Sequence, residues 1–446
     1  MLSSHPKSGS LASTAALLTL LASPAMAVDA AESARIRDLE QKLEHSMKMI
    51  ESLANKVQQL EQVKTTPVAV AAVAAPQDAR IDDLQKQVSD ITSARSRASD
   101  VGLPIHGFTD VGAGRSTQDN AVYGKGAKGF AVGNFDLYLT PQFGDRVKAL
   151  VELNFEVGAP NSLATPQASG VGVDLERLQL GYTFADSATG WLGRFHTPYG
   201  YWNNAFHHGA QIQTSIMRPR FLDFEDKGGI LPAHTTGAWL AGTIPLVGSK
   251  LGYDVYAGNA PQIVGNQLDM KMAGDFSHST STGFNVSFIP GDMPDLKVGL
   301  HGLRGQVHDD ATTRNITRLN MFGGYGMYNN DLLEILTEYY HFRNEDISGS
   351  TGKHGSSAWF AQAGYNLSGF TPYIRQEKTT LDQTDNYFAA QTSGRSYQRS
   401  VLGIRYDLNT KAAVKFEINH TKQNDLGVGI SADGYNESRV QYAVRF

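Results

Sequence analysis

A cluster of charged residues near the middle of the chain has the composition of a site that acts on ions. Its members lie within one short segment and are Arg218, Arg220, Asp223, Glu225, Asp226 and Lys227. Side chains of both signs grouped this closely create a strong local field, and rings of charged side chains select ions in this way. We therefore expect this segment to act on charged solutes at a constriction.

A second set of charged residues lies in segments where polar and apolar residues alternate. This set consists of Glu152, Glu156, Arg177, Arg194 and Arg405. Alternation places these side chains on the face of a strand opposite to its apolar residues. If the apolar face lies outside, the charged residues line an interior pore. Arginine outnumbers acidic residues in the later segments, which favours anions.

Other chemistry has weaker support in the sequence. His196, His207, His208 and His234 carry imidazole groups that could bind Zn²⁺. Histidines that face water or line a pore explain this pattern more simply, so we expect no metal site. There is no cysteine, which excludes thiolate metal sites and haem-attachment motifs. No nucleophile elbow is present, although a serine–histidine pair built into a barrel would leave no such motif. We expect no catalytic residues, no enzyme activity and no cofactor.

The elements that would position these residues are strands between residues 104 and 446. In Val147–Val157, apolar side chains fall on one face and mostly polar side chains on the other. About 16 segments of this kind recur, which suits an even-stranded membrane barrel with lipid outside and a polar lumen. The pattern predicts an all-β transmembrane β-barrel of antiparallel strands. A soluble propeller or sandwich would also have many short strands.

The connections between these segments alternate in length. Short turns such as Pro245–Ser249 and Asn409–Lys411 are followed by long polar loops such as Ala159–Gly172 and Thr380–Gly394. Short periplasmic turns and long extracellular loops are typical of outer-membrane barrels. The longest connection, residues 198–236, is rich in aromatic and aliphatic residues. We expect it to fold into the lumen and narrow it; the alternative is that it packs on a neighbouring subunit.

The first hundred residues follow a different pattern. Residues 1–27 have a positive charge, a short apolar core and an Ala-Met-Ala site, which is typical of a secretory signal. In residues 28–64 apolar residues recur at heptad positions a and d, which predicts a coiled coil; a single amphipathic helix lying on the barrel or membrane is the alternative. Residues 65–103 are expected to be a Pro/Ala-rich linker with a short second helical segment.

Bulk composition excludes two large classes of protein. The formal net charge of −5 provides no basic footprint for nucleic acid. No internal run approaches the roughly 20 apolar residues that a membrane-spanning helix needs.

Two features resemble known porin families. The stretch Leu192–Gly200 is similar to a motif of phosphate-selective porins of the O and P type, and a coiled coil before a barrel resembles the DcaP-like trimeric porins. The alternating segment that ends on Phe446 resembles the C-terminal aromatic signal of outer-membrane proteins. These resemblances imply a Gram-negative outer-membrane porin, with its coiled coil in the periplasm. They also imply a homotrimer that admits small hydrophilic solutes passively and favours anions. The chain departs from the phosphate type because it lacks a dense ladder of arginine and lysine.

Two other functions stay open at this point. The barrel could be a plugged anchor in outer-membrane lipid, tethered through its coiled coil to a periplasmic or cell-wall partner. It could also be a sheath for an electron-conducting partner, which would have to supply the haem itself. Ion conductance separates a diffusion pore from an anchor, because a plugged barrel conducts nothing.

Overall fold

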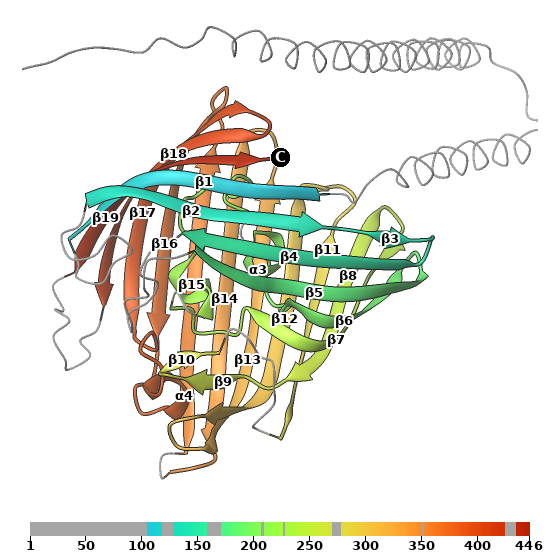
Figure 1. Cartoon of the computed structure of the whole chain (residues 1–446), viewed down its shortest axis with the longest axis vertical. Coiled ribbons are helices and arrows are strands. Elements are labelled where there is room, and N and C mark those ends of the chain that lie inside the picture. The colour runs from blue at the N-terminus through green and yellow to red at the C-terminus, as the bar shows by residue number, and fades with distance from the viewer. Residues whose placement is uncertain are drawn as a thin grey trace, which may run out of the picture. The chain divides into compact units, whose positions relative to one another are not determined.

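The computed structural model describes residues 105–117, 128–157, 171–206, 209–225, 228–269, 278–349, 352–423 and 434–446. These residues form a closed antiparallel β-barrel of 16 strands (Figure 1). The predicted barrel is thereby confirmed. The predicted signal segment (1–27), coiled coil (28–64) and linker (65–103) lie outside the described residues.

The barrel wall consists of long strands joined to their sequence neighbours. They are β1 (Ile105–Ser116), β2 (Lys128–Leu139), β4 (Val147–Val157), β5 (Val171–Ala185), β6 (Ala188–His196), β7 (His234–Leu246), β8 (Ser249–Asn259), β11 (Thr280–Ile289), β12 (Leu296–Asp309), β13 (Arg314–Asn329), β14 (Leu333–Asp346), β15 (Lys353–Tyr365), β16 (Phe370–Thr380), β17 (Tyr397–Asn409), β18 (Ala412–Gln423) and β19 (Tyr435–Arg445). The shorter elements are β3 (Gln142–Phe143), β9 (Gln262–Val264), β10 (Gln267–Leu268), the helices α3 (Trp202–Ala205) and α4 (Asn386–Ala389), and the 3₁₀ helix η1 (Arg220–Leu222).

The first and last strands close the barrel. β1 pairs antiparallel with β19 from Phe108 opposite Arg445 onward. Beyond the strand, Phe446 and Gly107 exchange two backbone hydrogen bonds of 3.1 and 3.3 Å, and the Phe446 ring stacks on Phe135 at 5.8 Å. Closure pairs the backbone groups that an edge strand would otherwise expose, which a lipid environment requires.

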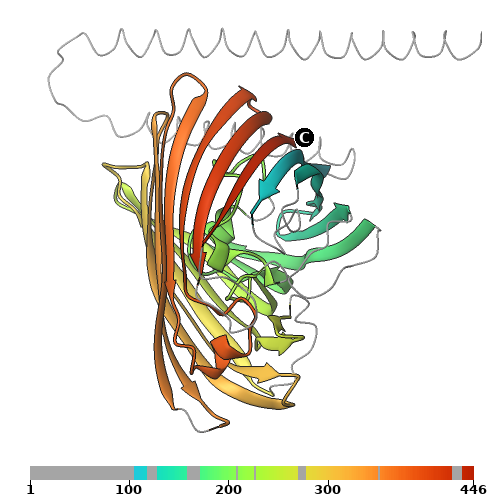
Figure 2. The same ribbon diagram turned by 90° about the vertical axis from the view of Figure 1, so that its left-hand side faces the viewer.

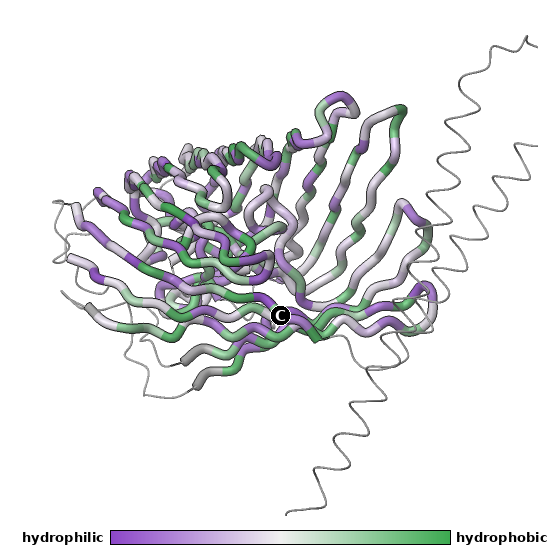
Figure 3. The backbone as a smooth tube through the Cα atoms, turned by 90° about the horizontal axis from the view of Figure 1, so that it is seen from above, coloured by the Kyte–Doolittle hydropathy of each residue, from purple (hydrophilic) through white to green (hydrophobic). Residues whose placement is uncertain are grey.

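The polarity of the two faces of the wall is the reverse of that in a soluble protein. Along β16, residues alternate strictly between exposed and buried. Arg375 and Glu377 point inward and are 0 and 2% exposed, whereas Phe370 and Ile374 point outward and are 47 and 56% exposed. Hydropathy alternates along many of the strands in the same way (Figure 3). An apolar outer face around a polar interior is the arrangement of a barrel in lipid.

A charged substitution on the outer face tests this orientation. We expect Leu402→Arg, in the apolar part of β17, to lower the unfolding free energy in lipid by about 2–4 kcal/mol. Gln398→Arg on the same face lies nearer the end of β17, where the cost falls to roughly 0–1 kcal/mol. Urea unfolding in lipid vesicles measures both. Equal losses of unfolding free energy in the two variants would contradict the position of Leu402 deeper in the membrane than Gln398.

The alternation in connection length is confirmed at most positions. At the end of the barrel that holds Ile105 and Phe446, β7 and β8 are joined by residues 247–248 and β17 and β18 by residues 410–411. We call this the turn end and the opposite one the loop end. Two connections at the loop end, residues 310–313 and 347–352, are shorter than the pattern predicts because their flanking strands extend further. No helix in the described ranges is both long and apolar enough to cross a membrane.

The long connection between β6 and β7, residues 197–233, runs into the barrel (Figures 1 and 2). We call it the inward loop. Its bounds differ by one to three residues from the predicted 198–236, because β7 begins at His234. The expected inward fold is observed, and its apolar residues join wall residues in one buried cluster.

Candidate pore constriction

Aromatic packing fixes the inward loop against the wall. Trp202 and Phe221 are both 0% exposed. The Trp202 ring meets Phe360 of β15 edge-on at 5.5 Å, and Phe221 meets Tyr340 of β14 at 5.4 Å. Rings of this size bury a large apolar area and prefer such edge-to-face contacts. The loop therefore lies on the β14–β15 side of the lumen.

Wall carboxylates accept hydrogen bonds from the loop backbone. The donors are the amides of Trp202 (to Glu338 Oε1, 2.6 Å), Ile216 (to Glu417 Oε2, 2.8 Å) and Arg220 (to Glu377 Oε2, 2.8 Å). These amides have no partner in a regular strand, and a buried N–H left unpaired is costly. Carboxylates on three different strands thus supply the hydrogen-bond acceptors that a neighbouring strand would otherwise provide to the loop backbone.

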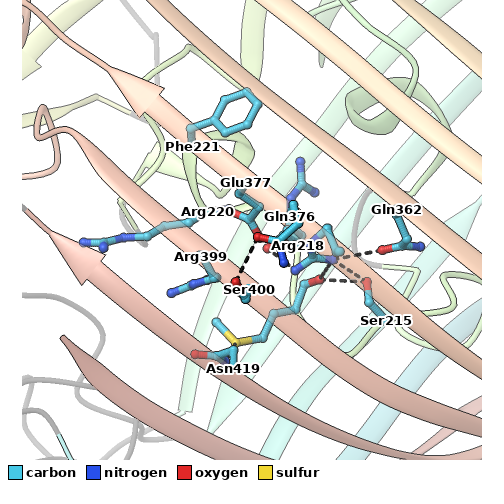
Figure 4. A network of polar contacts seen from close by, with 12 residues as sticks. Ser215, Arg218, Arg220, Phe221, Gln362, Gln376, Glu377, Arg399, Ser400 and Asn419 are labelled. Atoms are coloured by element: carbon cyan, nitrogen blue, oxygen red, sulfur yellow. Dashed lines mark hydrogen bonds and ion pairs between the residues drawn. The ribbon is translucent and has the colours of Figure 1, made fainter.

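Wall cations satisfy the loop carbonyls in the same way. Arg375 donates to Met217 O at 2.9 Å, to Arg218 O at 3.2 Å and to Ser215 Oγ at 2.8 Å. It also pairs with Glu377 at 2.9 Å. Figure 4 shows Ser215, Gln362 and Glu377 in this network.

Two more cations extend this anchoring along β17 and β18. Lys415 Nζ donates to Gln213 O at 2.7 Å, and Arg405 Nη1 donates to Gln211 O at 2.6 Å and to Gln213 O at 2.9 Å. Arg405 was expected to line the pore. It does lie on the lumen side, but its guanidinium binds loop carbonyls and Asp407, at 2.6 Å. Its main contacts are therefore structural.

The structure places Arg218 inside the loop, which differs from its expected position at the constriction. Its side chain donates to Leu222 O at 2.9 Å and to Asn203 Oδ1 at 3.1 Å, and it lies 4.3 Å over the Phe224 ring. Only 6% of the residue is exposed. Burial lowers the pKa of this guanidinium below its usual value. The side chain of Arg218 packs against the aromatic core of the loop, and the Leu222 carbonyl accepts a hydrogen bond from its guanidinium.

The remaining loop charges have different positions. Glu225 is 1% exposed and accepts from the His234 backbone at 3.0 Å, so it too differs from the expected constriction. Asp223 is half-buried and accepts from the Phe224 amide at 3.0 Å. Arg220 is half-buried, and its guanidinium reaches Tyr435 of β19 at 3.4 Å. Asp226, Lys227 and the side chain of Glu156 lie outside the described residues.

A cluster of ionisable residues covers the lumen wall on β4–β7. We call it the β5 cluster, and its members are Glu152, Glu176, Arg177, Arg194, His196 and His234. Glu152 pairs with Arg177, Glu176 lies 3.8 Å from Arg194, and His234 Nε2 is 3.0 Å from Glu176. Sequence reasoning found Glu152, Arg177 and Arg194 as lumen residues but missed Glu176.

A β-bulge explains the missed residue. The pairing of β4 with β5 shifts register between Glu152 and Leu153, so Glu176 has no partner position on β4. Two consecutive residues, Glu176 and Arg177, can then both face inward. The outward apolar residues of β5 are two apart except between Leu175 and Leu178, which are three apart. This break in the alternation is the signal that the sequence offers.

A second cluster lies on β17 and β19, beside the tip of the inward loop. We call it the β19 cluster; it contains Arg220, Arg399, Tyr435, Glu437 and Arg439. Glu437 accepts from Arg439 at 3.0 Å and lies 3.7 Å from Arg399.

In three of these ion pairs the arginine side chain is more exposed than its acidic partner. Side-chain exposure is 18% for Arg177 against 0% for Glu152, and 15% for Arg194 against 3% for Glu176. In the β19 cluster the values are 12% for Arg439 and 4% for its carboxylate partner. In these three pairs the guanidiniums are the more accessible groups, whereas Arg399, at 3%, is as buried as Glu437, at 4%.

Comparison with known proteins supports the fold. No protein family and no curated protein matches the sequence. A loop-deletion form of OmpT, an outer membrane protein of Vibrio cholerae, is similar in structure with a TM-score of 0.51 and 11% identity, covering 77% of this chain and 99% of that one. The fold is that of an outer-membrane β-barrel. The DcaP channel of Acinetobacter baumannii has a TM-score of 0.48 at 12% identity, covering 77% of this chain and 97% of its own. A mutant of the Rh. blastica porin has a TM-score of 0.43 at 12% identity, covering 77% and 100%.

The barrel holds a second inward segment that sequence reasoning missed. Residues 381–396 contain α4, whose Tyr387 and Phe388 are both 0% exposed. Tyr387 OH donates to Ile230 O of the inward loop at 2.6 Å, and the Phe388 ring meets Phe342 at 5.2 Å. Burial raises the pKa of the helix-capping Asp385 carboxyl to about 6. The adjacent aromatic residues were the available signal, by the same reasoning that was applied to the longer loop.

The histidines do not assemble a metal site in the described part of the barrel. The rings of His196 and His234 are 5.5 Å apart and belong to the β5 cluster. No group of three or more metal-ligating residues is found among the described residues. His207 and His208 lie outside them.

Gly200, at the end of the motif that enters the inward loop, tests how tightly this loop fits. Its φ of +63° favours glycine, and an added Cβ would lie 2.2 Å from Glu338 Oε2 and 2.3 Å from Tyr340 OH. We expect Gly200→Ala to lower the unfolding free energy by about 1–3 kcal/mol. Gly355→Ala is the control, because a Cβ there meets nothing within 4 Å. Thermal unfolding in detergent measures both, and equal midpoints would mean that the contact is loose.

Proposed function

We propose that this protein is an outer-membrane porin, a passive diffusion channel for small hydrophilic solutes. The observation that carries this proposal is a closed barrel with an apolar exterior, a charged lumen and a loop folded inward against one wall. A polar lumen is what a water-filled channel requires. A loop held to one side narrows such a channel, and its position sets the size limit.

We also propose a mild preference for anions. Arg177, Arg194 and Arg439 are each more exposed than the acidic partner with which they pair. Charged side chains at close quarters determine which ions enter a pore. Half-buried Arg220, rather than Arg218, is the loop residue that supports this preference.

A homotrimer is part of the proposal. Near the loop end, the outer face of β2 and β5 is apolar, with Phe130, Val132 and Val173 exposed by 96, 53 and 55%. Other strands carry polar residues at the same end. An apolar patch at the depth of lipid headgroups fits a contact with a neighbouring subunit.

We further propose that residues 28–64 form a periplasmic coiled coil able to contact a periplasmic or cell-wall partner, after export directed by residues 1–27.

The alternative is an envelope anchor whose barrel is plugged. The two inward segments favour it, because their aromatic side chains occupy part of the lumen; these are Trp202, Phe221, Tyr387 and Phe388. This reading also uses the predicted coiled coil as a tether.

Swelling of proteoliposomes that contain the full chain distinguishes the two functions. A porin admits sugars at rates that fall as their size increases, and heat-denatured protein is the control. Absence of swelling with every sugar, despite correct insertion, would reject the diffusion channel and favour the anchor.

A further inference from the structure

The outer face of β12–β18 carries a belt of cations directly beyond the apolar band. We call it the basic belt, and its members are Arg304, Arg318, Arg343, Lys353, Lys378 and Lys422. Four of them flank one another on β12–β15, and the other two follow on β16 and β18. Arg318 is half-buried and the others are exposed.

The alternation of exposed and buried residues along the strands, together with strand register, places these residues on the outer face. Tyr339 and Trp359 are cross-strand partners, exposed by 49 and 36%. Trp359 in turn lies opposite Lys378. Directly opposite residues of paired strands point to the same side of a sheet. Lys378 therefore stands beside an outward aromatic ring, and Gln398 connects it by register to Lys422.

Two members of the belt, Arg343 and Lys353, line a hollow. A cavity of about 460 Å³ is lined by Asn320, Arg343, Asn344, Glu345, Lys353 and His354. Arg304 lies opposite Asn320 in register. Glu345 is the acidic residue that lines this cavity, and its carboxylate already pairs with Arg318 at 2.7 Å. Among the described residues, no ion pair involves Arg304, Arg343 or Lys353.

The belt is confined to one end and one side of the barrel. The turns at the opposite end carry Asp145, Asp186, Asp292, Asp295 and Asp331. The outer face of β2 and β5 at the loop end is apolar instead. A chain with a net charge of −5 thus places the six cations of the belt at one end of its membrane-facing surface, whereas Arg146, Lys250 and Lys411 are exposed at the turn end.

We propose that the basic belt binds the phosphate groups of an anionic glycolipid in the outer leaflet, with Arg304, Arg343 and Lys353 as its centre. The inference rests on the proposed function, because that function places the loop end at the outer leaflet. Juxtamembrane lysine and arginine side chains attract anionic headgroups, and basic pockets at this depth bind phosphorylated ones. Arginine also matches phosphate geometry by donating two parallel hydrogen bonds.

Binding of diphosphorylated lipid A to the purified full chain tests the proposal, with native mass spectrometry as the readout. Each cation near an anionic lipid contributes about fivefold to affinity. We therefore expect the triple variant R304Q/R343Q/K353Q to bind more than tenfold more weakly. The matched control R146Q/K250Q/K411Q removes three exposed cations from the turn end and should bind within twofold of the wild type. The second variant K378Q/K422Q should show a smaller loss.

The experiment distinguishes a failure of lipid binding from a failure of the proposed porin function. Conductance is recorded from the same preparations, because outer-face substitutions leave the lumen unchanged. Weaker lipid binding only in the belt variants, with conductance retained, supports the proposal, as does a lower affinity for monophosphorylated lipid A. Equal binding in all variants, or equal losses in belt and control variants, overturns it. Absence of conductance in every preparation, wild type included, rejects the porin function but leaves the lipid comparison valid.

Discussion

Removing the Arg375 side chain is expected to release the inward loop and to widen the channel. Arg375 is 0% exposed and binds Ser215, the carbonyls of Met217 and Arg218, and Glu377. Arg375→Ala leaves this carboxylate buried without its cation, and breaking a buried pair costs about 3–5 kcal/mol. Single-channel recording should show a larger and noisier conductance than the wild type.

The control lies on the same strand. Lys378→Ala removes a cation from the outer face of β16 and touches no loop residue, so its conductance should match that of the wild type. Thermal unfolding shows whether each variant keeps its barrel. If Arg375→Ala folds and its conductance and noise are unchanged, the anchoring role of Arg375 is wrong.

The second large effect is expected on ion selectivity. The double variant R220Q/R439Q removes two charges from the β19 cluster, while Glu437 keeps Arg399 at 3.7 Å. No buried carboxylate is therefore left without a cation. A unit charge a few ångströms from a passing ion contributes roughly 1 kcal/mol even in bulk water. We expect the chloride-to-potassium permeability ratio to fall by about fivefold.

Reversal potentials under a KCl gradient measure this ratio. The matched control, R115Q/K422Q, removes the same charge from the outer faces of β1 and β18. It should leave the ratio unchanged. An equal shift in both double variants would show that overall charge, rather than the lumen surface, sets the preference.

Much of the barrel could be predicted from the sequence because period-two alternation is local. Each outward apolar residue, such as Ile374 or Leu402, reports the face of its own strand without knowledge of its neighbours. The bounds of the inward loop followed from the strands on either side of it. Its inward fold followed from its apolar content, since aromatic residues such as Trp202 and Phe221 need burial.

The chemistry of the loop could not be predicted in the same way. Arg218 and Arg220 are two residues apart, yet one is buried in the loop core and the other reaches Tyr435. Which arginine faces the lumen depends on how the loop backbone turns against β16, and this is a tertiary property. The anchoring roles of Arg375 and Lys415 were hidden for a related reason. Both bind backbone carbonyls of the loop, and a backbone carbonyl carries no signature in a sequence.

Planar-bilayer recording of the purified full chain tests the central claim of a passive, narrowed pore most directly. The proposed function predicts stepwise openings, grouped in threes for the proposed trimer, with a reversal potential that favours chloride under a KCl gradient. Silent membranes, with protein shown to be inserted and folded, would contradict the diffusion channel and leave the plugged anchor as the function of this barrel.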